Sequence, residues 1–242
     1  MLVDHSLTYV LARGLPGLLN FLAIAVYTRL LQPEAYGDYS LVIAGVALLD
    51  SLLIQWLRLG LLRFLPKDQA AEAAMLQSLR NLWLRIIAAV SAGTVVLSLL
   101  PVNPVPLPLL FSGLLLFICQ GWFELNLELS RKRLQPRSYG RLALQRAVLA
   151  LLFGGLLAWL WGAPGLLLGL SLGSVAAFVL NRQVCDWSGG TLQVDGVLLS
   201  TLLSYGLPLT ITFALGFIVN SSDRFLIGWL LGRSETGLYS AG

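Results

Sequence analysis

Arg13, Arg58 and Asp50 are charged residues inside long apolar runs of the sequence, where an ionised side chain is costly and usually has a function. Arg13 and Arg58 are cations of the kind that hold an oxyanion through paired hydrogen bonds. Asp50 is a carboxylate that can bind a proton or a small cation. Each residue also has a structural alternative. The arginines can extend to lipid headgroups, and Asp50 can pair with Arg13 or with a donor on another helix.

The composition identifies the solvent around these residues. Of the 242 residues, 57% are hydrophobic and only 12% are charged. Soluble domains carry about 25% charged residues, so this chain has too few charges to cover a surface that faces water. A soluble enzyme, a disordered tail and a disulfide-stapled secreted domain are therefore excluded. We expect an all-α polytopic membrane protein.

Catalytic and metal-binding residue types are scarce. Cys119 lies in an apolar run and Cys185 in a polar stretch, so neither a disulfide nor a metal-binding spacing is expected. The single histidine, His5, leaves no His-based triad or zinc cluster. We therefore expect a protein that is not an enzyme, with no catalytic residue, no metal and no cofactor.

Apolar segments long enough to cross a bilayer, which takes about 20 residues, recur along the chain. They lie at residues 7–31, 39–62, 82–100, 107–127, 142–161 and 165–180, and a seventh runs from near 197 to 220 or on to 231. The connectors are short and contain Pro and Gly. Pro16 and Pro208 lie inside the first and seventh segments, where each should bend its helix.

The distribution of positive charge predicts the orientation. The net charge is +4, and 13 of the 16 Lys and Arg residues lie in or beside the connectors of one side. That side, with the N-terminus, should face the cytoplasm. Topology therefore accounts for the basic character of the chain, and no nucleic-acid partner is expected.

Two short motifs recur in the same order. A Gly-Leu-Pro sequence at 14–16 returns at 206–208, and Tyr-Gly-Asp-Tyr-Ser at 36–40 is similar to Thr-Gly-Leu-Tyr-Ser at 236–240. Six spans separate the copies, which indicates repeats related by an axis along the membrane normal. We expect a six-helix lobe over 1–182, a cytoplasmic linker over 183–196 and the start of a second lobe over 197–242. The chain should thus be a fragment of a longer protein or an incomplete gene product.

The segment 29–40, Arg-Leu-Leu-Gln-Pro-Glu-Ala-Tyr-Gly-Asp-Tyr-Ser, resembles the first exterior turn of the polysaccharide flippase family, with Gln32 in place of the usual glycine. Residues 205–208, 222–228 and 237–240 resemble the opening of that family's second half. The family includes Wzx-type O-antigen translocases and belongs to the superfamily of multidrug and toxin extrusion transporters and lipid II flippases.

The resemblance implies a transporter of the bacterial cytoplasmic membrane whose two lobes rock around a cavity. Its substrate would be an undecaprenyl-diphosphate-linked oligosaccharide, and membrane lipids would surround it. On this reading Arg13 and Arg58 flank the diphosphate, Asn20 lines the cavity, and Asp50 binds a coupling proton or Na⁺. Asp223 and Arg224, a dipeptide that recurs in the family's second half, would form a gate or inter-helix pair.

Two alternatives remain open at this stage. A cation-coupled multidrug antiporter of the same fold would need acidic residues in the N-terminal lobe, and Asp50 is one. A membrane-embedded polysaccharide polymerase, ligase or glycosyltransferase would use the same lipid donors. Such an enzyme usually needs a sizeable exterior loop with catalytic side chains, and the exterior connectors here are only a few residues long.

Overall fold

The computed structural model describes residues 2–100, 105–133, 136–181 and 196–242, without the side chains of 2–13, 136, 137, 197 and 220. The described part is 93% helical and contains no strand, which confirms the all-α prediction. The helices are α1 (Leu2–Leu30), α2 (Pro33–Leu53), α3 (Gln55–Phe64), α4 (Gln69–Leu99), α5 (Leu107–Lys132), α6 (Pro136–Leu180), α7 (Gly196–Leu230) and α8 (Arg233–Ala241).

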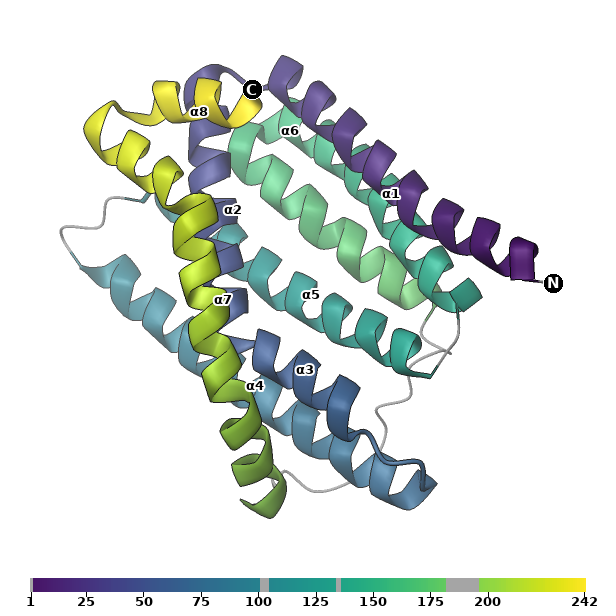
Figure 1. Ribbon diagram of the computed structural model, residues 1–242. Coiled ribbons are helices and arrows are strands. Elements are labelled where there is room, and N and C mark those ends of the chain that lie inside the picture. Colours follow the sequence, from purple (N-terminus) through teal and green to yellow (C-terminus); the bar gives the residue numbers. More distant parts are fainter. Residues whose placement is uncertain (1, 101–104, 134–135, 182–195) are drawn as a thin grey trace.

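Helix α6 consists of two arms, because the chain reverses at Gly162, where φ is 66°. This φ value favours glycine, and the break falls in the predicted connector between the fifth and sixth spans. The arms pack tightly: a Cβ on Gly173 would lie 2.7 Å from the backbone nitrogen of Ala150. Helix α1 lies along this hairpin (Figure 1), and the Tyr27 hydroxyl donates a hydrogen bond to the Ala150 carbonyl at 2.8 Å.

The predicted second span, residues 39–62, is two helices rather than one. Helix α2 ends at Leu53 and α3 starts at Gln55, with Ile54 between them at φ −110° and ψ −33°. Figure 1 shows α3 continuing at an angle to α2. Pro16 and Pro208 lie inside α1 and α7, as expected.

The outer surface of the bundle is apolar. Large side chains such as Phe21, Trp159 and Trp229 are 69%, 71% and 82% exposed. Five of the described helices are long and apolar enough to cross a membrane, and one of them is the two-armed α6. A surface of this kind is stable only in lipid. The chain is therefore a multi-pass membrane protein, as its composition predicts.

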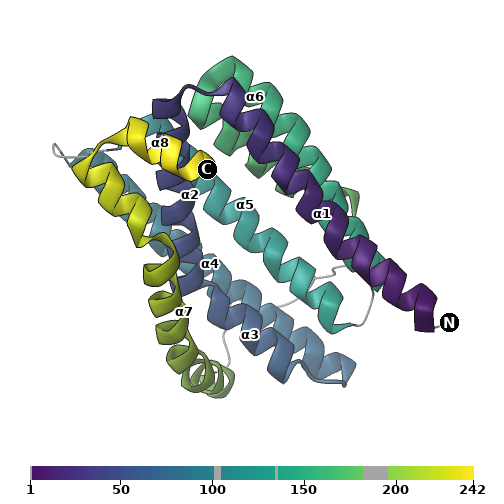
Figure 2. The same ribbon diagram turned by 45° about the horizontal axis from the view of Figure 1, so that its top comes forward.

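Helices α7 and α8 pack on α2 and α3 (Figures 1 and 2). On the side of α3, a Cβ on Gly206 would lie 2.6 Å from Cβ of Trp56, and the Arg63 guanidinium lies 4.8 Å from the centre of the Tyr205 ring. Of the predicted linker over 183–196, only Gly196, the first residue of α7, lies within the described residues. Helices α7 and α8, which we expect to begin a second lobe, thus lie directly against α2 and α3.

Candidate functional site

A network of charged side chains joins four helices inside the bundle. The Arg58 guanidinium on α3 contacts the Asp50 carboxylate on α2 and donates to the side-chain oxygen of Gln55. Arg58 also lies 3.8 Å from Glu124 on α5, which accepts a 2.7 Å hydrogen bond from Arg146 on α6. With both acids and both arginines ionised, this charge network has no net charge.

The break between α2 and α3 brings the first pair together. In a continuous helix, residues eight positions apart are separated by about 12 Å along the axis. The turn at Ile54 shortens that path, and Asp50 and Arg58 meet. Their side chains are 14% and 13% exposed. Ion pairing with good geometry offsets the cost of removing such charges from water.

One oxygen of the network is open to a further partner. Asp50 uses Oδ2 toward Arg58, whereas its Oδ1 atom is buried and has no hydrogen-bond partner among the described residues. A buried acceptor in this state costs about 1–3 kcal/mol. The geometry therefore offers Oδ1 to a proton or to a small cation.

Arg146 faces a cavity of about 250 Å³ between α1, α5 and α6. Pro16 and Asn20 line it from α1, Gln120 and Phe123 line it from α5, and the Arg146 guanidinium lies 4.9 Å from the centre of the Phe123 ring. The cavity thus places a cation, two amides and an aromatic face against a lining that is otherwise aliphatic. This set of groups suits a phosphate and a polar head group.

The structure unites some of the predicted site residues and separates others. Arg58 and Asp50 are paired directly, and Asn20 lies in the cavity beside the charge network. Arg13 belongs to α1, but its side chain lies outside the described ones. Two participants, Glu124 and Arg146, were missed, although both lie inside predicted spans, where a charged residue is itself a signal.

Asp223 and Arg224 belong to α7 and lie beside the first turn of α2, at the end of α2 opposite to the charge network. The Asp223 carboxylate accepts hydrogen bonds from the Tyr239 hydroxyl on α8 and from the backbone N–H of Arg224 at 2.8 Å. The hydrogen bond to Asp223 raises the pKa of Tyr239. The inter-helix partner of Asp223 is therefore Tyr239, and the contact ties α7 to α8.

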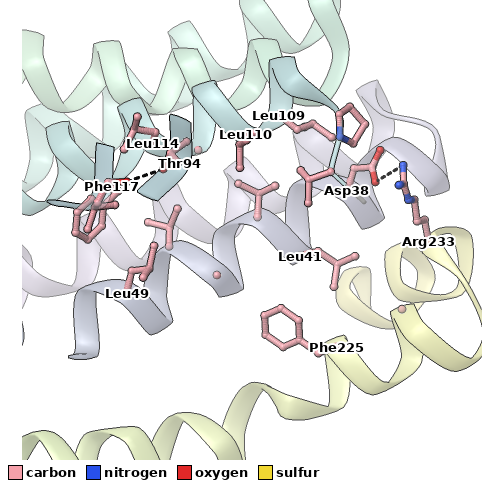
Figure 3. Close-up of a pocket in the computed structure, with 18 residues that line it drawn as sticks. Asp38, Leu41, Leu49, Thr94, Leu109, Leu110, Leu114, Phe117, Phe225 and Arg233 are labelled. Carbon is pink, nitrogen blue, oxygen red and sulfur yellow. Dashed lines mark hydrogen bonds and ion pairs between the residues drawn. The ribbon is translucent and has the colours of Figure 1, made fainter. Parts of the chain in front are cut away.

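A larger cavity of about 520 Å³ lies between α2, α4, α5 and α7, and its lining is mostly aliphatic (Figure 3). At one end Asp38 and Arg233 form an ion pair with a 3.2 Å separation. At the other end Phe117 and Leu49 line the wall. This cavity suits hydrocarbon rather than a charged ligand.

These features define a multi-pass helical membrane protein with a half-buried charge network beside a cavity that carries a few polar groups. Among the described residues, no group of three or more His, Cys, Asp or Glu side chains could hold a metal ion.

A family model described as "Polysaccharide biosynthesis protein" matches residues 26–242, and the chain belongs to that family. This match confirms, at the level of the family, the resemblance seen at residues 29–40. No curated protein and no solved structure matches the chain significantly.

Proposed function

We propose that this protein moves an undecaprenyl-diphosphate-linked oligosaccharide across the bacterial cytoplasmic membrane for surface polysaccharide synthesis. The observation that carries the proposal is the charge network of Asp50, Arg58, Glu124 and Arg146 inside an apolar bundle. Family membership supports a role in polysaccharide biosynthesis. The proposal assigns the chain transport and no bond-making or bond-breaking step.

The two arginines of the network are the proposed diphosphate ligands. Guanidinium groups bind phosphate oxygens in pairs, and Arg146 already lines the cavity between α1, α5 and α6. While the arginines are paired with Asp50 and Glu124, the network is neutral, and the pairing offsets part of the cost of keeping four charges in the membrane. A diphosphate that enters the site takes over the arginines, and the acids must then gain another partner.

Asp50 is the proposed coupling residue. Its open Oδ1 atom gives a proton or Na⁺ a place to bind when Arg58 turns to the substrate. Asn20 and Gln120 would hydrogen-bond the sugar side of the head group in the cavity. Arg13, two turns before Asn20 on α1, would meet the diphosphate as it approaches from the cytoplasm, if the N-terminus lies on that side.

A second candidate function is cation-coupled drug efflux. The open oxygen of Asp50 favours it, because a buried carboxylate can exchange a proton for a cationic drug. The two functions differ in their need for arginine. A diphosphate carrier requires Arg58 and Arg146, whereas a carrier of cationic drugs works better without them.

The test is complementation in a bacterial strain that lacks its own translocase. Wild-type protein should restore surface polysaccharide and remove lipid-linked repeats from the inner leaflet. Arg146→Gln should reduce export at least tenfold with normal membrane insertion. Arg85→Gln is the matched control, because Arg85 is exposed on α4. If the wild-type protein fails to restore export but makes the same cells resistant to drugs, the flippase proposal is refuted and drug efflux is the better assignment.

A further inference from the structure

The cavity of about 520 Å³ between α2, α4, α5 and α7 is apolar along most of its length. Leu41, Leu109 and Phe117 are typical of its wall (Figure 3). The hydroxyl of Thr94, which also lines it, already donates a hydrogen bond to the Val90 carbonyl of its own helix at 2.9 Å. Apolar cavities of this kind hold no ordered water. Hydrocarbon is the occupant that recovers the dispersion contacts an empty cavity loses.

The cavity is accessible from the apolar outer surface because α4 packs mainly on α5. Of the five described helices that are long and apolar enough to span, α4 is the least buried. Two residues that line the cavity, Leu49 and Phe225, are 37% and 38% exposed. At Gly45, which lies between them and the start of α2, a Cβ would meet nothing within 4 Å. A chain from the surrounding bilayer can therefore enter and lie along α2.

The depth of the cavity corresponds to one leaflet of a bilayer. Its lining residues on α2 run from Asp38 to Leu49, which is about 17 Å of helix. Half of the hydrocarbon core of a bilayer is about 15 Å thick. Asp38 directly precedes the apolar segment that begins at residue 39, so it lies at the level of the head groups. The cavity thus matches one acyl chain of a phospholipid, whereas the far longer undecaprenyl chain would extend out of it.

The charged end of the cavity complements a head group with charges of both signs. Asp38 and Arg233 form an ion pair there, and their side chains are 18% and 39% exposed. Among the described residues that line the cavity, no other is charged. Glu34, one turn before Asp38 on α2, is exposed and adds a second carboxylate. A phosphate can bind Arg233 while a nearby ammonium binds the carboxylates. A purely anionic head group would leave the carboxylates without a partner.

We propose that this cavity is a binding site for a zwitterionic aminophospholipid of the phosphatidylethanolamine type. One acyl chain lies beside Gly45, the phosphate binds Arg233, and the ammonium binds Asp38 and Glu34. The bound lipid fills the space between α2, α4 and α7 and so stabilises the bundle. The site shares no residue with the charge network or with the smaller cavity, and it does not depend on the proposed transport function.

The first test measures which lipid the protein retains. The full chain would be reconstituted in nanodiscs with equal amounts of phosphatidylethanolamine and phosphatidylglycerol of the same acyl composition, then released for native mass spectrometry. The wild-type protein should retain one phosphatidylethanolamine. Gly45→Leu places a side chain in the cavity and should lower that retention about tenfold. Gly93→Leu is the matched control, because a Cβ at Gly93 also meets nothing within 4 Å and Gly93 is exposed on α4 outside the cavity.

The second test concerns the head group and uses substitutions at the surface. Asp38→Asn removes a carboxylate and leaves Arg233, so the ratio of retained phosphatidylethanolamine to phosphatidylglycerol should fall about tenfold, as expected for one lost charge-assisted hydrogen bond. Glu235→Gln is the matched control, because Glu235 is exposed on α8 and does not line the cavity. It should leave the ratio unchanged.

Three results would overturn the site. The first is wild-type retention of phosphatidylethanolamine by Gly45→Leu, and the second is equal retention of the two phospholipids by the wild-type protein. The third is displacement of the retained lipid by an equimolar amount of undecaprenyl phosphate, which would assign the cavity to the lipid carrier. None of these measurements involves export, so a failure of the transport proposal would leave them unchanged.

Discussion

The start of α2 contacts α8 through close backbone packing with an ion pair at its edge, whereas the last turn of α2 contacts charged groups from three other helices. At the first turn, Gly37 and Gly237 bring two backbones together. At the last turn, Asp50 connects through Arg58 to Glu124 and Arg146. Backbone contact at glycine leaves no room for an added side-chain atom, while an ion network in a membrane must always be compensated. The first region is therefore sensitive to side-chain size and the second to charge.

The largest effect should come from breaking the charge network. Arg58→Gln leaves Asp50 and Glu124 without one cation partner, and loss of one member of a buried ion pair costs about 3–5 kcal/mol. The midpoint of thermal unfolding in detergent should fall clearly, and export should be abolished. The double variant Asp50→Asn with Arg58→Gln should recover stability but not export. Equal stability of the single and double variants would show that the pair is not coupled.

A smaller effect is expected at two glycines of α2, where substitution by alanine should change the free energy of unfolding in opposite directions. Gly37→Ala should destabilise the protein by about 1–3 kcal/mol, because its Cβ would overlap the backbone of α8. Gly45→Ala should stabilise it by up to about 1 kcal/mol, since alanine is the better helix former and the site has room. Chemical denaturation of both variants in the same detergent measures the difference. Equal shifts would refute the tight contact between α2 and α8.

The smallest effect should come from the ion pair at the edge of the contact between α2 and α8. Asp38→Asn and Arg233→Gln should each change the free energy of unfolding by less than about 1 kcal/mol, because the pair is partly exposed. A double-mutant cycle at low and high salt measures the coupling between them. The coupling energy should shrink as salt increases. A large coupling energy that does not depend on salt would contradict this prediction and show that the pair is shielded from solvent, like the charge network.

Features encoded locally were predictable from the sequence, and those made by packing were not. The spans follow from apolar length, and the turn at Gly162 follows from the Gly-Ala-Pro sequence there. The break at Ile54 has no proline or glycine beside it, and the sequence alone suggested one continuous helix.

The candidate site likewise contains residues that the sequence identifies and residues that only the packing of helices identifies. Asp50 and Arg58 were recognisable as charges inside an apolar run. The contact between Glu124 and Arg146 depends on how α5 packs on α6, which the sequence does not reveal. The repeat at 36–40 and 236–240 is visible in the sequence, but the sequence does not indicate that the two copies are in contact.

The Ser240 hydroxyl donates a hydrogen bond to the Ser40 hydroxyl at 3.2 Å, and the two residues are 200 positions apart, at equivalent places in the repeated motif. This serine pair has a consequence for how such a chain arises. A side chain that meets its own equivalent across a two-fold axis is the geometry of a symmetric homodimer. If one repeat unit once formed such dimers, gene duplication and fusion would turn the intersubunit contact into an intrachain one without changing its residues. Positions 40 and 240 would then be constrained as a pair, since a bulky side chain at either would have to be accommodated by the other.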